Sequence, residues 1–126
     1  MEIEQEIYFL LSNIIPTDAV EFLLFCEAES TAYEMKFYVR FTNGLQKDCY
    51  TLAEQGLLNE DGIDNMFQQI YEKLILTKEF NPQKRNVFTF KTDRRLYFFI
   101  AKQYDRAINL YLIKQEWRKK YLSAAE

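Results

Sequence analysis

The 126-residue chain predicts a single α+β domain in which an antiparallel sheet packs helices against one face. Runs of alternating apolar and polar residues predict strands, and apolar residues at helical spacing predict helices before, between and after them. The apolar share of 48%, with nine Tyr, eleven Phe and one Trp, is enough for one core. The expected order is α-β-β-β-α-β-β-α over residues 1–126, with neither an internal repeat nor a linker.

The first predicted helix covers residues 2–14. Its apolar residues recur every three or four positions, as one buried face of a helix requires, and Pro16 follows its end. These residues are Ile3, Ile7, Leu10, Leu11 and Ile14.

Two strands follow, at residues 20–29 and 33–41. In the second, every other residue from Tyr33 to Phe41 is apolar, which predicts one buried and one polar face. Asn43-Gly44 predicts a tight turn, because both residues tolerate positive φ, and a third strand is expected at residues 46–52.

The second half of the chain is predicted to form a helix, a hairpin and a last helix. The helix begins near Ile63 and runs to about Phe80, before Asn81-Pro82. The hairpin joins residues 87–92 and 96–102 through Asp93-Arg94, and its aromatic residues on both faces predict that both sides are covered. From Asp105 onward, the first apolar residues fit the spacing of a strand as well as that of a helix. The spacing of the apolar residues up to Tyr121 and the basic residues near the end favour a helix.

Several classes of activity lack the residues they need. With no His, the chain has neither Ser-His nor Cys-His catalysis, and it lacks the commonest zinc ligand. Three glycines supply no phosphate-binding loop. Cys26 and Cys49 form no CxxC pair and are expected to be reduced and buried. With no signal-like start and no membrane-spanning apolar run, a cytoplasmic protein is expected.

Charge is segregated along the chain. Residues 1–35 hold eight acidic and no basic residues, whereas residues 94–126 hold eight basic and three acidic ones. A net charge of −3 disfavours binding to nucleic acid or to an anionic membrane, and the segregation predicts steering toward an oppositely charged partner. The alternative is that the acidic and basic segments pack against each other or stay solvated.

Three further features each allow two interpretations. Glu27 and Glu29 share a strand face about 7 Å apart and suit acid–base chemistry, but no complete catalytic constellation accompanies them. Residues 59–64 faintly resemble a calcium loop and fit a helix N-cap better. Trp117, beside basic residues 118–120, is either a core anchor or an interface residue. No catalytic residue, cofactor or metal site is expected.

Five segments spread over the chain together resemble the YezG-type (DUF600) immunity proteins of bacterial polymorphic toxin systems. They are Ile14-Ile15-Pro16, Phe37-Tyr38-Val39-Arg40, residues 66–74, Gln103-Tyr104-Asp105 and residues 117–122. The resemblance implies a cytoplasmic antitoxin that binds a secreted toxin domain, often a nuclease, in contact-dependent growth inhibition and bacterial competition, and blocks its active site or substrate surface.

An acidic inhibitor surface suits such a role, because a nuclease must be cationic to hold its substrate. The expected partner-binding residues are the carboxylates of the first two strands and the residue just before them: Asp18, Glu21, Glu27, Glu29 and Glu34. Exchange of Glu27 and Glu29 for Lys is expected to weaken binding and to leave stability nearly unchanged.

The rival interpretation is a type III secretion chaperone, which is also small and acidic and has the same order of elements. Such chaperones dimerise and wrap an unfolded effector segment over apolar grooves. The sequence leaves open whether this chain is a monomer or a dimer, so the oligomeric state does not yet separate the two classes.

Overall fold

The computed structural model describes residues 2–93 and 97–122. Its five strands form one antiparallel sheet in the order β3-β2-β1-β4-β5. Along the chain the elements are α1 (Ile3–Ser12), β1 (Ala19–Ala28), β2 (Tyr33–Phe41), β3 (Gln46–Asp48), α2 (Cys49–Glu54), α3 (Glu60–Leu74), β4 (Arg85–Thr92), β5 (Tyr97–Tyr104) and α4 (Leu110–Tyr121). The predicted fold class and order are confirmed, with α2 as one additional short helix.

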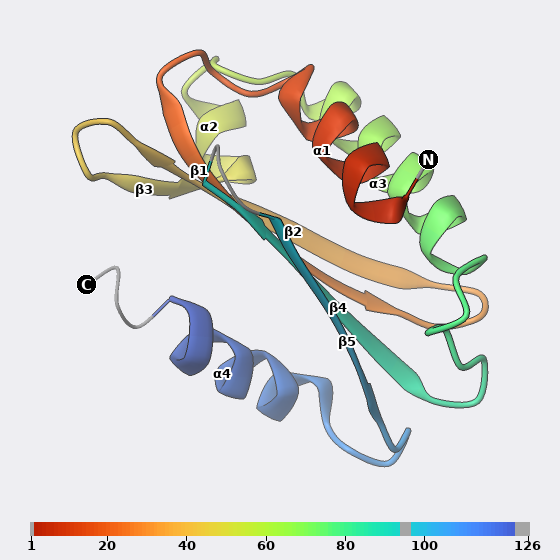
Figure 1. Cartoon of the computed structure of the whole chain (residues 1–126). Helices are drawn as coiled ribbons and strands as arrows, with labels where there is room; N and C mark the ends of the chain where they lie inside the picture. Colours follow the sequence, from red (N-terminus) through yellow and green to blue (C-terminus); the bar gives the residue numbers. More distant parts are fainter. Residues whose placement is uncertain (1, 94–96, 123–126) are drawn as a thin grey trace.

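The helices lie on both faces of the sheet rather than on one. Figure 1 shows α1, α2 and α3 over one face and α4 alone over the other. The reason lies in β1, whose residues are apolar on both sides: Leu24 faces the three-helix side, whereas Leu23 and Phe25 pack with Trp117 of α4. The sheet therefore separates a large core from a small one.

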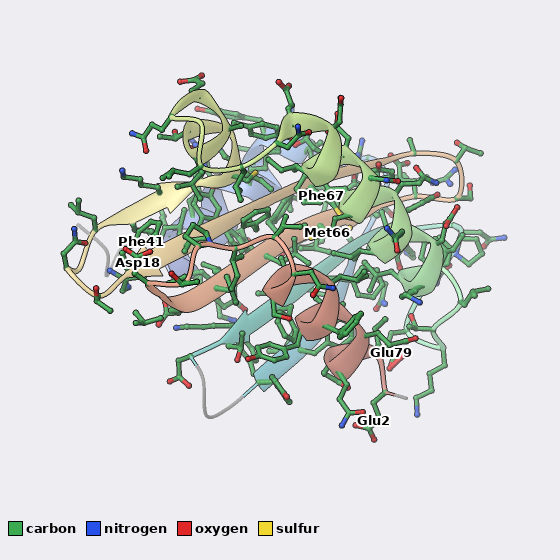
Figure 2. The ribbon with its side chains drawn as sticks, turned by 90° about the horizontal axis from the view of Figure 1, so that it is seen from above. Glu2, Asp18, Phe41, Met66, Phe67 and Glu79 are labelled. Atoms are coloured by element: carbon green, nitrogen blue, oxygen red, sulfur yellow. The ribbon has the colours of Figure 1, made fainter. Side chains whose placement is uncertain are left out.

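The large core lies between the sheet and α1 and α3. Phe37 of β2 meets Phe67 of α3 edge to face, with 6.0 Å between the ring centroids, and Figure 2 shows Met66 and Phe67 on the side of α3 that faces the sheet. Alternation in β2 places Phe37 and Val39 in this core, where both are fully buried.

The predicted third strand is only half correct, because residues 49–54 form a helix. Asp48 ends β3, and its carboxylate accepts a hydrogen bond from the backbone N–H of Thr51 at 2.9 Å, which caps α2. Cys49 and Leu52 are three residues apart, so one helical turn buries both. That burial outweighs the alternating pattern of so short a segment.

Helix α3 ends at Leu74, six residues before the predicted end. The hydroxyl of Thr77 donates a hydrogen bond to the carbonyl of Leu74, and Leu76 is 84% exposed, so the buried stripe does not continue. Two parts of the predicted hairpin, Arg94 and Leu96, lie outside the described residues. Within the described residues, no helix has the length and apolarity to cross a membrane.

Candidate functional site

The sequence-predicted carboxylates gather on the α4 side of the sheet. In β1, Glu21 and Glu27 alternate with Phe22 and Cys26, so they share the face of Phe25, which packs against α4. Alternation in β2 sets Glu34 on this face too, opposite the buried Met35 and Phe37. Their surroundings therefore decide whether these carboxylates form a free acidic surface.

Arginines neutralise the carboxylates at the end of β1. The guanidinium of Arg85, on β4, lies 3.8 Å from Glu27 and 3.6 Å from Glu29. Arg106 approaches Glu29 from the loop before α4, at 4.0 Å. Glu27 and Glu29, whose spacing suits acid–base chemistry, are thus held by cations from two other segments.

Glu27 is the most enclosed of the five predicted residues. It is 3% exposed, and its Oε2 has no hydrogen-bond partner within the described part of the chain. Burial raises the pKa of Glu27, and neighbouring Glu29 raises it further, whereas Arg85 and Lys114 oppose the shift. Glu27 therefore offers almost no surface to a partner protein in this structure.

The other carboxylates differ in how far they are neutralised. Glu21 lies between Arg40 at 3.7 Å and Lys91 at 4.0 Å, and Glu34 forms an ion pair with Lys114 of α4. Asp18, exposed at the start of β1 (Figure 2), has no ion-pair partner among residues 2–93 and 97–122.

Four of the five residues are thus engaged within the chain. Part of the acidic segment packs against basic groups of the second half, as the alternative interpretation of the charge pattern expected. Whether these residues also meet a partner stays a prediction.

Trp117 anchors the small core. Its side chain lies edge to face with Phe25 and stacks on Tyr38, with centroid distances of 5.1 and 5.9 Å. Its indole N–H donates a hydrogen bond to the hydroxyl of Thr89 on β4 at 2.8 Å. At 6% exposure the residue is buried, which confirms the core interpretation of this position.

A second set of carboxylates lies on the opposite side of the molecule, at the start of α1 and along α2 and α3. All are exposed, and none has an ion-pair partner within the described residues. We call this set the acidic helical layer: Glu2, Glu54, Glu60, Asp61, Asp64 and Glu72. The only cation of α3, Lys73, pairs with Glu6 at 3.3 Å and so does not offset the layer.

The sequence analysis missed this layer because it summed charge over long segments. The middle of the chain balances overall, but its acids concentrate on α2 and α3 while Lys36, Arg40 and Lys91 point to the other side of the sheet. The signal was nevertheless present, since Asp64 and Glu72 occupy the positions between the apolar residues of the helical pattern.

Residues 59–64 start a helix, as predicted. The side chain of Asn59 accepts a hydrogen bond from the backbone N–H of Gly62 at 3.1 Å and caps α3. Within the described residues, no group of three or more acidic or thiol side chains is placed to hold a metal ion. Cys26 and Cys49 are buried as expected, and burial raises the pKa of Cys49 to about 11, which leaves its thiol protonated.

The site therefore consists of two surfaces of opposite sign, separated by the sheet. One is the acidic helical layer, and the other is α4 with Lys114, Arg118, Lys119 and Lys120. Neither models of known protein families nor curated protein sequences match this chain.

Proposed function

We propose that this protein is a cytoplasmic immunity protein, a non-enzymatic domain that binds and neutralises a cognate toxin domain. The observation that carries the proposal is the acidic helical layer, which is exposed, forms no ion pair with another described residue, and lies on the opposite side of the sheet from the cations of α4. The resemblance to YezG-type immunity proteins supports the same function. The proposed partner is a basic nuclease whose active site or substrate surface becomes blocked.

Unpaired surface carboxylates suit this role for a physical reason. A nuclease concentrates positive charge where it holds phosphates, so a layer of carboxylates attracts it before contact and speeds association. The carboxylates of α3 stand on a 15-residue helix that is fixed by Ile63, Phe67 and Ile70 in the core. Their spacing is therefore rigid, as a specific interface requires.

The first experiment identifies the partner. The tagged protein is used to capture partners from its own cells at low and at raised salt, and the captured protein is then expressed alone and together with this chain. We expect a folded, basic domain that stops growth when expressed alone and is harmless in the presence of this chain. A partner without toxicity, or no stoichiometric partner, would contradict the proposal.

The second experiment locates the contact surface with a matched pair of variants. Asp64→Asn combined with Glu72→Gln removes two charges from the acidic helical layer, and Leu112→Lys combined with Gln115→Lys changes net charge equally on exposed positions of α4. We expect the first pair to weaken binding roughly tenfold at low salt and less at high salt, and the second to have little effect. Equal effects would show that only net charge matters.

The alternative is a secretion chaperone, and one observation favours it. Ile108, Tyr111 and Leu112 are exposed at the start of α4, with Tyr111 at 62%, and chaperones need such apolar surface to hold an unfolded segment. The same capture experiment separates the two functions. A dimer that retains an unfolded effector segment, lost on Tyr111→Ser, would establish the chaperone.

A further inference from the structure

A pocket of about 320 Å³ lies between α4, β2 and Tyr50 of α2. Its floor includes Phe25 and Tyr38 of the sheet, α4 contributes Trp117 and Arg118, and Tyr50 of α2 closes one edge. Small-molecule sites occupy about 300–1,000 Å³ and combine aromatic walls with a few placed polar groups. The volume of this pocket and its mixture of aromatic and charged lining residues are both typical of a small-molecule site.

Three cations line the pocket, together with one carboxylate. Lys36 lies 3.8 Å from Asp48, and Lys114 pairs with Glu34. Arg118 forms no ion pair with any described residue. No carboxylate of the described residues therefore competes with an incoming anion for its guanidinium.

Two of the three cations lie close together on α4. Lys114 and Arg118 are four residues apart on α4, where like charges repel. Burial lowers the pKa of Lys114, and Arg118 lowers it further, whereas Glu27 opposes the shift. An anion bound between them would relieve the repulsion, which makes the pocket selective for negative groups.

The aromatic wall is held in a fixed orientation. The indole of Trp117 is tied to Thr89 by its N–H, and the ring of Tyr38 stacks on it at an interplanar angle of 29°. Lys36 lies 5.5 Å from the centre of the Tyr38 ring. A flat ligand ring can thus lie against a prepared surface with a cation next to it.

We propose that this pocket binds a small phosphate ester that carries a planar ring, of the size of a nucleoside monophosphate, with the phosphate on Arg118 and Lys114 and the ring against Tyr38 and Tyr50. Of the three cations in the lining, Lys36 is paired with Asp48 and Lys114 with Glu34, whereas Arg118 has no ion-pair partner among the described residues. A guanidinium can hold a phosphate, which carries about −1.5 to −2 charges at neutral pH, through two parallel hydrogen bonds, and the two lysines line the same pocket. The inference does not rest on the proposed function, because none of the residues that line the pocket belongs to the acidic helical layer.

Trp117 provides a direct readout, since it is the only tryptophan of the chain and lines the pocket. Its fluorescence is excited at the red edge of its absorption while AMP, UMP, adenosine or inorganic phosphate is added, and calorimetry repeats each titration. We expect saturable binding of at least one of the two nucleotides at millimolar or lower concentration. Adenosine and inorganic phosphate, each with half of the recognition elements, should bind about tenfold more weakly.

Two variants on neighbouring residues decide whether the pocket is responsible. Arg118→Ala should weaken nucleotide binding about tenfold. Lys119→Ala removes the same charge from a residue outside the pocket lining and should change the affinity for the nucleotide by less than about twofold. Both side chains are exposed, so both variants should fold, which circular dichroism checks. Absence of saturable binding by both nucleotides, equal loss in the two variants, or inorganic phosphate binding as tightly as AMP would overturn the proposal.

Discussion

The indole N–H of Trp117 donates a hydrogen bond to the hydroxyl of Thr89, joining α4 to β4 at 2.8 Å across 28 residues of sequence. Thr89 is 3% exposed, so both partners lie in a largely dry environment where an unpaired polar group would be costly. The bond fixes the rotation of Trp117, and Ile113 one turn earlier is buried by the same packing. Among the described residues α4 is the only helix on its side of the sheet, and this contact ties it to β4.

Truncation of Trp117 should destabilise the protein strongly. Trp117→Ala removes the largest side chain of the small core and leaves Thr89 unpaired, so we expect the free energy of unfolding to fall by roughly 3–5 kcal/mol. Denaturant unfolding followed by circular dichroism measures the change. Tyr111→Ala, on the exposed side of α4, should change stability by less than about 0.5 kcal/mol. Similar losses for the two variants would show that α4 is not held by its buried face.

Charge reversal at Glu27 should also destabilise the fold, in contrast to the expectation from sequence. Glu27→Lys places a second cation beside Arg85 in a position that is 3% exposed, and breaking such a pair costs roughly 3–5 kcal/mol. Glu29→Lys, at a partly exposed position, should cost about 1 kcal/mol or less. Thermal unfolding of each single variant separates the two, and partner binding is interpretable only for the variant that stays folded.

The pH dependence of stability should carry a signature of Glu27. Because burial raises the pKa of Glu27 in the folded chain, the native state binds this proton at a higher pH than the unfolded state. Glu27 therefore contributes most to the free energy of unfolding when its side chain is protonated. This contribution falls as the pH rises from the ordinary glutamate pKa through the raised pKa of the folded chain. Denaturant unfolding between pH 7 and pH 4 should show wild type gaining stability relative to Glu27→Gln as pH falls. A gain for the variant instead would mean that Arg85, and not burial, dominates.

The fold was largely predictable because its strongest patterns are long. Strand β2 was predicted with its observed ends, Tyr33 and Phe41, because alternation over nine residues fits the spacing of a strand and not that of a helix. The segment after Gln46 was harder, because it is short and follows a turn that predicts a strand, and its helical spacing rests on only two residues, Cys49 and Leu52. Short segments take the structure that their tertiary contacts favour.

The site was less predictable because the sequence does not show which charged residues form ion pairs with each other. No partner for Glu27 and Glu34 is visible in the sequence, because Arg85 reaches Glu27 only through the pairing of β1 with β4, and Lys114 reaches Glu34 only through the packing of α4. Ion pairs between residues far apart in the sequence cannot be predicted from its pattern, whereas the acidic positions of α3 follow from the helical spacing of that segment. The position of α4 on the sheet therefore determines whether a carboxylate such as Glu34 is available to a partner protein.

Asn86 should be the least replaceable polar residue of the fold. It is fully buried, its Nδ2 lies within 3.1 Å of the carbonyl oxygens of Ala28, Asn81 and Lys84, and its Oδ1 accepts a hydrogen bond from the backbone N–H of Asn81. Asn86→Asp keeps the shape but sets a carboxylate among three carbonyls, so we expect it to lose about 3 kcal/mol or more at neutral pH. The loss should shrink as pH falls, because a protonated Asp can donate again. Denaturant unfolding at several pH values tests this, with the exposed Asn65→Asp on α3 as the control. A pH-independent loss would show that shape rather than hydrogen bonding matters at this position.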